Sequence, residues 1–116
     1  MEELIKSLES IQAKEPDFYN ALKDVIVYLG STYEEKYAAS PLDTKGLLYD
    51  KKLGKGANIH NATKYIQRYA TEGFSKSEMP IDLKKSIHYL LFELTRKEKI
   101  KEKESLGISP QKVKSN

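Results

Sequence analysis

The sequence predicts an all-α protein, a small bundle of about four amphipathic helices with a charged, partly disordered C-terminal tail. Three observations predict it. Apolar residues recur at helical spacing in four segments, no stretch of useful length alternates as a strand does, and prolines and glycines separate the segments. The 116 residues suffice for one domain, which we expect over residues 1–96, with a frayed helix end and tail over residues 97–116.

Two helices are expected before the first irregular stretch. An apolar stripe predicts the first helix over residues 2–14, and Pro16 ends it because proline cannot continue a helix interior. Asp17 suits the N-cap of the second helix, and Gly30 either ends that helix or kinks it. The two stripes consist of Leu4, Leu8 and Ile11, and of Phe18, Leu22, Val25, Ile26 and Leu29.

A third helix is predicted after the irregular residues 38–57, within which a short helix could include Leu47, Leu48 and Tyr49. Asn58 suits the N-cap of this third helix, which is expected to run to about Thr71. Its helical wheel separates two arcs. The expected core arc holds Ile59, Ala62, Ile66, Tyr69 and Ala70, and the polar arc holds Asn61, Lys64, Tyr65 and Arg68.

The fourth helix is expected to begin near Asp82 and to run to about Lys103. It carries the strongest apolar stripe of the chain, which we expect to face the core. The stripe consists of Leu83, Ile87, Leu90, Leu91 and Leu94.

Composition and charge exclude several classes of protein. The formal net charge is +3, but residues 95–116 carry +4 and leave −1 for the rest, so no basic fold is expected to bind nucleic acid specifically. The absence of cysteine excludes disulfides and thiolate metal sites. No apolar run has the length of a membrane span, and the start Met1-Glu2-Glu3 lacks a basic signal-peptide region, so we expect a cytoplasmic protein.

The turn over residues 54–58 is a candidate phosphate site. Lys55 and Gly56 precede Asn58, and the N-terminus of a helix offers free N–H groups and a positive dipole end. Lys64 and Arg68 continue along the polar arc and could add charge. The alternative is a flexible turn before an ordinary solvated helix face, because the spacing is not that of a Walker loop.

Carboxylates and histidines offer weaker candidates. Glu34 and Glu35 could contribute to a Mg²⁺ site, but a third acidic residue one turn later is missing. The position three residues after Glu93 is Arg96 and not an acidic residue, so a helix-capping role for Glu34 is favoured. His60 and His88 lack the spacing of a zinc site. We therefore expect no metal ligands, and we expect His88 at the edge of the core with a phosphate contact as the alternative.

Residues 56–96 resemble a small phage-associated helical family that is regarded as nucleotide-kinase-like. The resemblance rests on Asn61-Ala62-Thr63-Lys64-Tyr65-Ile66-Gln67-Arg68 and, after a glycine-containing loop, on Asp82-Leu83-Lys84-Lys85-Ser86-Ile87-His88-Tyr89-Leu90. It implies a role in the nucleotide metabolism of a phage or mobile element. The matching polar positions are Asn61, Lys64, Arg68, Asp82 and Lys85.

Together these patterns predict a small nucleotide- or phosphate-binding protein, with nucleotide conversion as an open extension in which Asp82 would serve Mg²⁺ or act as a base. The alternative is a non-enzymatic interaction module, an inhibitor or scaffold that binds a host or phage protein. A homo-oligomer is also expected, because so small a bundle often completes its core across a dimer. The expected ligand contacts are Lys55, Gly56, Asn58, Asn61, Lys64, Tyr65, Arg68, Asp82, Lys85 and His88.

Overall fold

The structure, a computed structural model, describes residues 1–32, 42–71 and 80–107. All regular structure in these ranges is helical, which confirms the all-α prediction. The five helices are α1 (Glu2–Lys14), α2 (Pro16–Thr32), α3 (Leu42–Tyr49), α4 (Gly54–Ala70) and α5 (Pro80–Ser105). Among the described helices, none combines the length and apolar character that a membrane span requires.

The chain divides into two compact units, residues 1–38 and residues 39–116. That residues 1–96 form one domain therefore stays a prediction. In the first unit α1 and α2 meet at Glu15, whose N–H donates to the Ile11 carbonyl (2.7 Å) and whose carbonyl accepts from the Tyr19 N–H (2.9 Å). Pro16 opens α2 as its first residue, where a missing N–H is harmless. Gly30 lies inside α2 and does not end it, while Glu34, for which a helix-capping role was favoured, lies outside the described residues.

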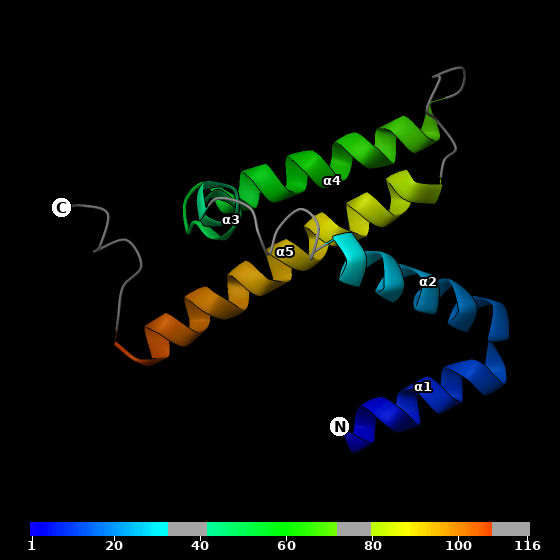
Figure 1. Ribbon diagram of the computed structural model, residues 1–116. Helices are drawn as coiled ribbons and strands as arrows, with labels where there is room; N and C mark the ends of the chain where they lie inside the picture. Colours follow the sequence, from blue (N-terminus) through cyan, green and yellow to red (C-terminus); the bar gives the residue numbers. More distant parts are fainter. Residues whose placement is uncertain (33–41, 72–79, 108–116) are drawn as a thin grey trace. The chain divides into compact units, whose positions relative to one another are not determined.

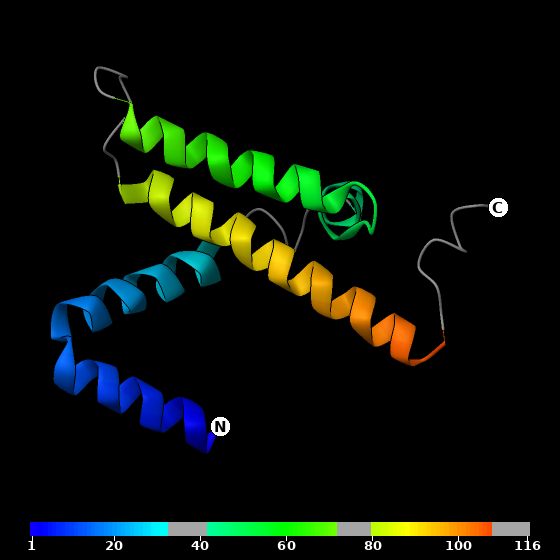
Figure 2. The same ribbon diagram turned by 180° about the vertical axis from the view of Figure 1, so that it is seen from behind.

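In the second unit α4 and α5 run side by side in opposite directions (Figures 1 and 2). The hydroxyl of Ser86 donates to the Ala62 carbonyl (2.9 Å), and the amide of Asn58 donates to Glu93 (3.2 Å), so residue pairs close to the loop and far from it both match an antiparallel hairpin. The seam between the two helices is made of small and polar side chains. It contains Asn58, Ala62, Asp82 and Ser86, all at most 3% exposed.

The predicted core arcs of both helices are therefore wrong in large part. Ala62 is buried as expected, but Ile59 is 42% exposed and Ile66 is 45% exposed. On α5 the apolar stripe, Leu83, Ile87, Leu90, Leu91 and Leu94, is 36–64% exposed. The physical reason is that Ala62 and Ser86 let the two backbones approach closely enough for a hydrogen bond, and this turns the larger apolar side chains out of the seam.

The short helix α3 packs across the far end of the hairpin, where α4 begins (Figure 1). Leu48 is 4% exposed, and the rings of Tyr49 and Phe92 lie 5.8 Å apart. The end of α5 also contacts this region, because Lys51 Nζ lies 3.3 Å from Glu104 Oε2. α5 extends to Ser105, close to the expected end near Lys103. That this end frays stays a prediction, and the tail beyond residue 107 lies outside the described residues.

Candidate anion-binding site

Three cationic side chains from two helices converge on the ring of Tyr65. Lys64 Nζ lies 4.7 Å from the ring centre, Lys85 Nζ lies 5.0 Å from it and Arg68 Cζ lies 5.2 Å from it. Lys64, Tyr65 and Arg68 come from α4, whereas Lys85 comes from α5. We call these four half-buried residues the Tyr65 cluster. It unites four of the residues that the sequence predicted for phosphate binding.

A row of aromatic rings packs against Tyr65, the centre of the cluster. The rings of Tyr65 and Tyr89 are nearly parallel, with an interplanar angle of 12° and centres 6.1 Å apart. Tyr89 in turn meets Phe92 at 6.0 Å, and Phe92 stacks on His88 at 4.7 Å. Since aromatic side chains have few rotatable bonds, this row holds the cluster in place with little loss of conformational entropy.

The cluster concentrates positive charge. Because each cation lies within 5.2 Å of one ring centre, the three charges lie within about 10 Å of one another. At that separation two like charges repel by roughly 0.4 kcal/mol in water, and by about four times as much at the lower effective dielectric of a protein surface. The ion pairs among the described residues are Lys51–Glu104 and Glu93–Arg96, and neither includes Lys64 or Lys85. An anion seated beside Lys64 and Lys85 would relieve the repulsion between these two lysines.

The other predicted ligand contacts lie elsewhere. Lys55 and Gly56 are exposed in the first turn of α4. Lys55 precedes Arg68 by thirteen helical residues, which corresponds to about 20 Å along the axis. A single phosphate therefore cannot contact both, and the predicted site separates into a helix start and the Tyr65 cluster.

The helix start differs from its prediction. α4 begins at Gly54, not at Asn58, and Asn58 is fully buried. Asn58 Nδ2 donates to the Leu48 carbonyl (2.9 Å) and to Glu93 Oε1 (3.2 Å), so the side chain is a packing residue and not an N-cap. The carboxylate of Asp50 already accepts the N–H groups of Lys52 (2.8 Å) and Leu53 (2.9 Å) just before the helix. This carboxylate therefore lies directly before the turn over residues 54–58, where a phosphate was expected.

The remaining predicted ligand contacts, Asn61, His88 and Asp82, each have a different environment. Asn61 Nδ2 donates to the Ala57 carbonyl of its own helix (2.9 Å). His88 is 6% exposed and stacks on Phe92, a buried position deeper than the expected core edge. Asp82 is 3% exposed, and its Oδ2 is a buried oxygen without a hydrogen bond.

Metal-ligating groups do not gather in the described residues, where no three His, Cys, Asp or Glu side chains could hold one ion. Glu34 and Glu35 lie outside the described residues. His60 is exposed on α4. Asp82, which the resemblance offered for Mg²⁺, is too deeply buried to present an open coordination site.

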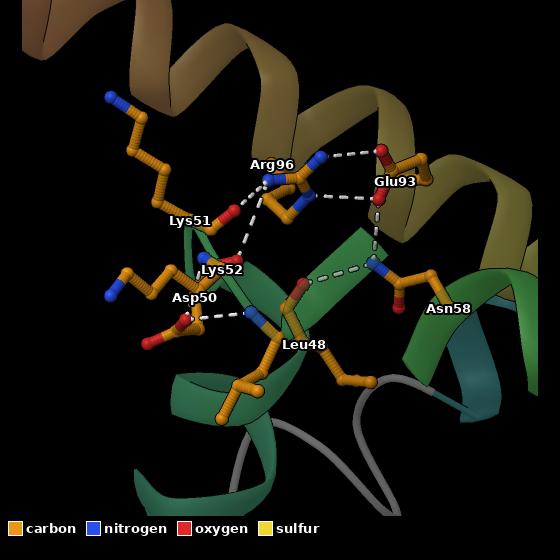
Figure 3. Close-up of polar contacts among 8 residues, drawn as sticks. Leu48, Asp50, Lys51, Lys52, Asn58, Glu93 and Arg96 are labelled. Atoms are coloured by element: carbon orange, nitrogen blue, oxygen red, sulfur yellow. Dashed lines mark hydrogen bonds and ion pairs between the residues drawn. The ribbon is translucent and has the colours of Figure 1, made fainter. Parts of the chain in front are cut away.

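A buried ion pair near α3 is the polar centre that the sequence analysis missed (Figure 3). Arg96 grips the carboxylate of Glu93 with two hydrogen bonds, Nε to Oε1 at 2.8 Å and Nη2 to Oε2 at 2.7 Å. Its Nη1 donates to the Lys51 carbonyl at 3.0 Å, beyond the end of α3. The i,i+3 spacing of Glu93 and Arg96 was visible in the sequence, but such pairs are usually solvated and nothing in it signalled that Arg96 is 3% exposed.

The ion pair stabilises the charged form of both side chains. The hydrogen bonds from Arg96 lower the pKa of Glu93 below its usual value, against the effect of burial, and the Asn58 amide lowers it further. The same pairing raises the pKa of Arg96. Gly54 completes the arrangement, because a Cβ atom there would lie 2.5 Å from Arg96 Cδ and 2.5 Å from the Leu48 carbonyl oxygen. Only glycine lets α3, α4 and Arg96 approach this closely.

Comparisons with known proteins add no relative, since no family model, curated protein or solved structure matches this chain.

Proposed function

We propose that this chain binds the phosphate group of a nucleotide or of another small phosphate compound, and that the Tyr65 cluster holds it. The observation that carries the proposal is the convergence of Lys64, Arg68 and Lys85 on one ring. Lys64 and Lys85 take part in neither of the ion pairs between described residues, and phosphate supplies up to two negative charges with several acceptor oxygens.

The side chains of the cluster suit phosphate chemically. The guanidinium of Arg68 can grip two phosphate oxygens in a fixed fork, and the ammonium groups of Lys64 and Lys85 act as mobile point charges. All three are half-buried, so their attraction for an anion is screened less than that of fully exposed lysines. The Tyr65 ring is already engaged by Tyr89 and by the cations, so we assign it to positioning the charges rather than to stacking on a base.

The resemblance of residues 56–96 to the phage-associated family supports a nucleotide over other phosphate compounds, because its matching positions include Lys64, Arg68 and Lys85. The proposal covers binding and not nucleotide conversion. The carboxylate that conversion would use, Asp82, is 3% exposed.

Calorimetric titration with nucleoside mono-, di- and triphosphates and with pyrophosphate tests the proposal. The variant Lys64→Ala with Lys85→Ala removes two charges of the cluster, and Lys55→Ala with Lys101→Ala removes two exposed charges on the same two helices. We expect the first variant to weaken binding at least tenfold, since one charge-assisted hydrogen bond contributes about 1.5–3 kcal/mol. The second should change it less than threefold. Equal losses in the two variants, or unchanged affinity in the first, would refute the assignment.

A protein-interaction module is a second candidate function, favoured by a different observation. Seven large apolar side chains of α4 and α5 are more than a third exposed, as a surface that contacts another protein would be.

A further inference from the structure

The division of the chain into two units separates its charges. Residues 39–116 contain sixteen Lys and Arg against nine Asp and Glu, a net charge of +7, whereas residues 1–38 carry −4. α4 contributes two lysines and one arginine to this excess and no acidic residue. The positive charge is therefore not confined to residues 95–116, where the sequence had located it. A unit with this net charge attracts polyanions.

A second group of cations lies on the same hairpin as the Tyr65 cluster. Lys99 Nζ lies 5.1 Å from the ring centre of Tyr49, the last residue of α3. Lys103 follows Lys99 by four residues on α5, so it lies one turn further along the same face. Both lysines are exposed, and neither takes part in the ion pairs between described residues. We call Lys99 and Lys103 the distal pair.

A row of aromatic rings connects the distal pair to the Tyr65 cluster. The ring of Tyr49, beside Lys99, has its centre 5.8 Å from that of Phe92. Tyr89 continues the row, with its ring centre 6.0 Å from that of Phe92 and 6.1 Å from that of Tyr65. The two groups of cations therefore lie at the two ends of one continuous series of ring contacts.

The two groups also share one line along α5. At about 100° per residue, Lys85, Lys99 and Lys103 lie within about 40° of one another around the helix axis. The three glutamates of α5 beyond residue 97 lie on other faces, about 100° or more from Lys85 and Lys103. These glutamates are Glu98, Glu102 and Glu104. The line therefore combines positive charge with aromatic surface.

The length of this line corresponds to several nucleotides. Lys85 and Lys99 are fourteen helical residues apart, which corresponds to about 21 Å along the axis. A stacked strand of nucleic acid carries one phosphate per about 3.4 Å, so about six phosphates span this distance. A ligand that contacts both the Tyr65 cluster and the distal pair must therefore be extended along the hairpin.

A single strand of nucleic acid suits this arrangement. Proteins that bind single strands without sequence preference combine cations that follow the backbone with aromatic side chains beside them. The rings of Tyr49, Tyr65 and Tyr89 are half-buried, so each offers part of its surface next to the cations. A flexible strand can follow the straight axis of α5, whereas a duplex is stiff over this length and its phosphates wind around its own axis.

We propose that the α4–α5 hairpin binds a single strand of nucleic acid without sequence preference, with one phosphate at the Tyr65 cluster and others at the distal pair. This inference rests on the proposed function, because the Tyr65 cluster supplies the first phosphate contact, and it extends the ligand from a nucleotide to a strand. Affinity should fall as the salt concentration rises, since each phosphate contact releases counterions from the strand.

Fluorescence anisotropy of a labelled strand of twelve deoxythymidine nucleotides with the full chain tests the proposal. Lys99→Ala with Lys103→Ala removes the distal pair. The control Lys97→Ala with Lys101→Ala removes the same charge from exposed positions of α5 that lie about 120° and 160° from Lys85. We expect the first variant to weaken strand binding at least fivefold, and the control to weaken it less than twofold.

Two further readouts separate the distal pair from the Tyr65 cluster. The first variant should leave the affinity for pyrophosphate in calorimetry within twofold of the native value. Its slope of log affinity against log salt concentration should be smaller by about 1.4, because each single-strand phosphate contact contributes about 0.7. Circular dichroism checks that the helices persist, since all four substituted side chains are exposed.

Each outcome decides the proposal. A loss of strand binding that is confined to the variant without the distal pair supports it. Equal losses in the two variants, or a strand of three nucleotides that binds as tightly as the long one, overturn it while pyrophosphate binding still supports the proposed function. Tighter binding of a duplex or of inorganic polyphosphate overturns the assignment to a single strand. A native chain that binds neither pyrophosphate nor the strand overturns both proposals.

Discussion

Arg96 and the cations around Tyr65 lie on the same α4–α5 hairpin, but they differ in burial and in their contacts. Arg96 is 3% exposed, and its hydrogen bonds go to Glu93 and to the backbone after α3. Lys64 and Lys85 share a tyrosine ring and have no carboxylate partner among the described residues. The difference separates a cation that the fold itself neutralises from cations that remain available to a ligand.

The contrast also separates stability from binding. A buried charge whose partner is removed costs far more than an exposed one, because the remaining charge stays desolvated. We therefore expect changes at Glu93 and Arg96 to alter stability, and changes in the Tyr65 cluster to alter ligand binding.

The largest expected effect follows replacement of Arg96 by methionine, which leaves the carboxylate of Glu93 near the seam without its partner. We expect Arg96→Met to lower the free energy of unfolding by roughly 3–5 kcal/mol. Urea unfolding followed by circular dichroism measures it. The control Lys97→Met removes the neighbouring exposed cation and should change stability by less than about 0.5 kcal/mol. Comparable losses in the two variants would contradict a structural role for Arg96.

A smaller effect should follow at Gly54, where the three structural elements meet. A Cβ atom there meets both the Leu48 backbone and Arg96 Cδ, so Gly54→Ala should cost about 1–3 kcal/mol through overpacking. Gly56→Ala, two residues later in the same helix, meets nothing within 4 Å and should stabilise the protein by about 0.4–1 kcal/mol. Thermal unfolding of the pair checks this, and equal shifts of the melting temperature would show that helix propensity alone accounts for both.

The smallest effect is the acid dependence of stability that comes from Glu93. Its pKa is lower in the folded state than its usual value of 4.5, so the unfolded state binds a proton more readily between the two values. The stabilisation is complete above about pH 4.5 and is lost as the pH falls through the folded pKa. Urea unfolding at pH 7, 5, 4 and 3 measures it. Glu93→Gln should flatten this part of the profile, and an unchanged slope would place the acid sensitivity elsewhere.

The helices follow well from the sequence, because local signals fix them. The α1 range was predicted in full, and Pro16 separates it from α2 as expected. The start of α4 was predicted four residues late, since an asparagine before a helical stripe usually caps it and nothing local reveals that Asn58 is buried. Which face of α4 and α5 is buried depends on tertiary contacts between Ala62 and Ser86, which no periodicity encodes.

The candidate site was predictable in part for the same reason. Helical spacing places Lys64 and Arg68 on one arc, and the resemblance added Lys85 from another helix. The separation of Lys55 from these residues could not be foreseen while the helix was thought to begin at Asn58. The pairing of Glu93 and Arg96 has an ordinary i,i+3 spacing, and it is structural because Arg96 is 3% exposed and also donates to the Lys51 carbonyl beyond α3.

The most direct test of the central claim is an amide NMR titration of the ¹⁵N-labelled chain with a nucleoside triphosphate and with pyrophosphate. We expect the largest chemical-shift changes at residues 64–68 of α4 and at Lys85, and small changes at Glu93 and Arg96. Largest changes at residues 54–58, or no changes at millimolar ligand, would contradict the claim that the Tyr65 cluster is the anion-binding site.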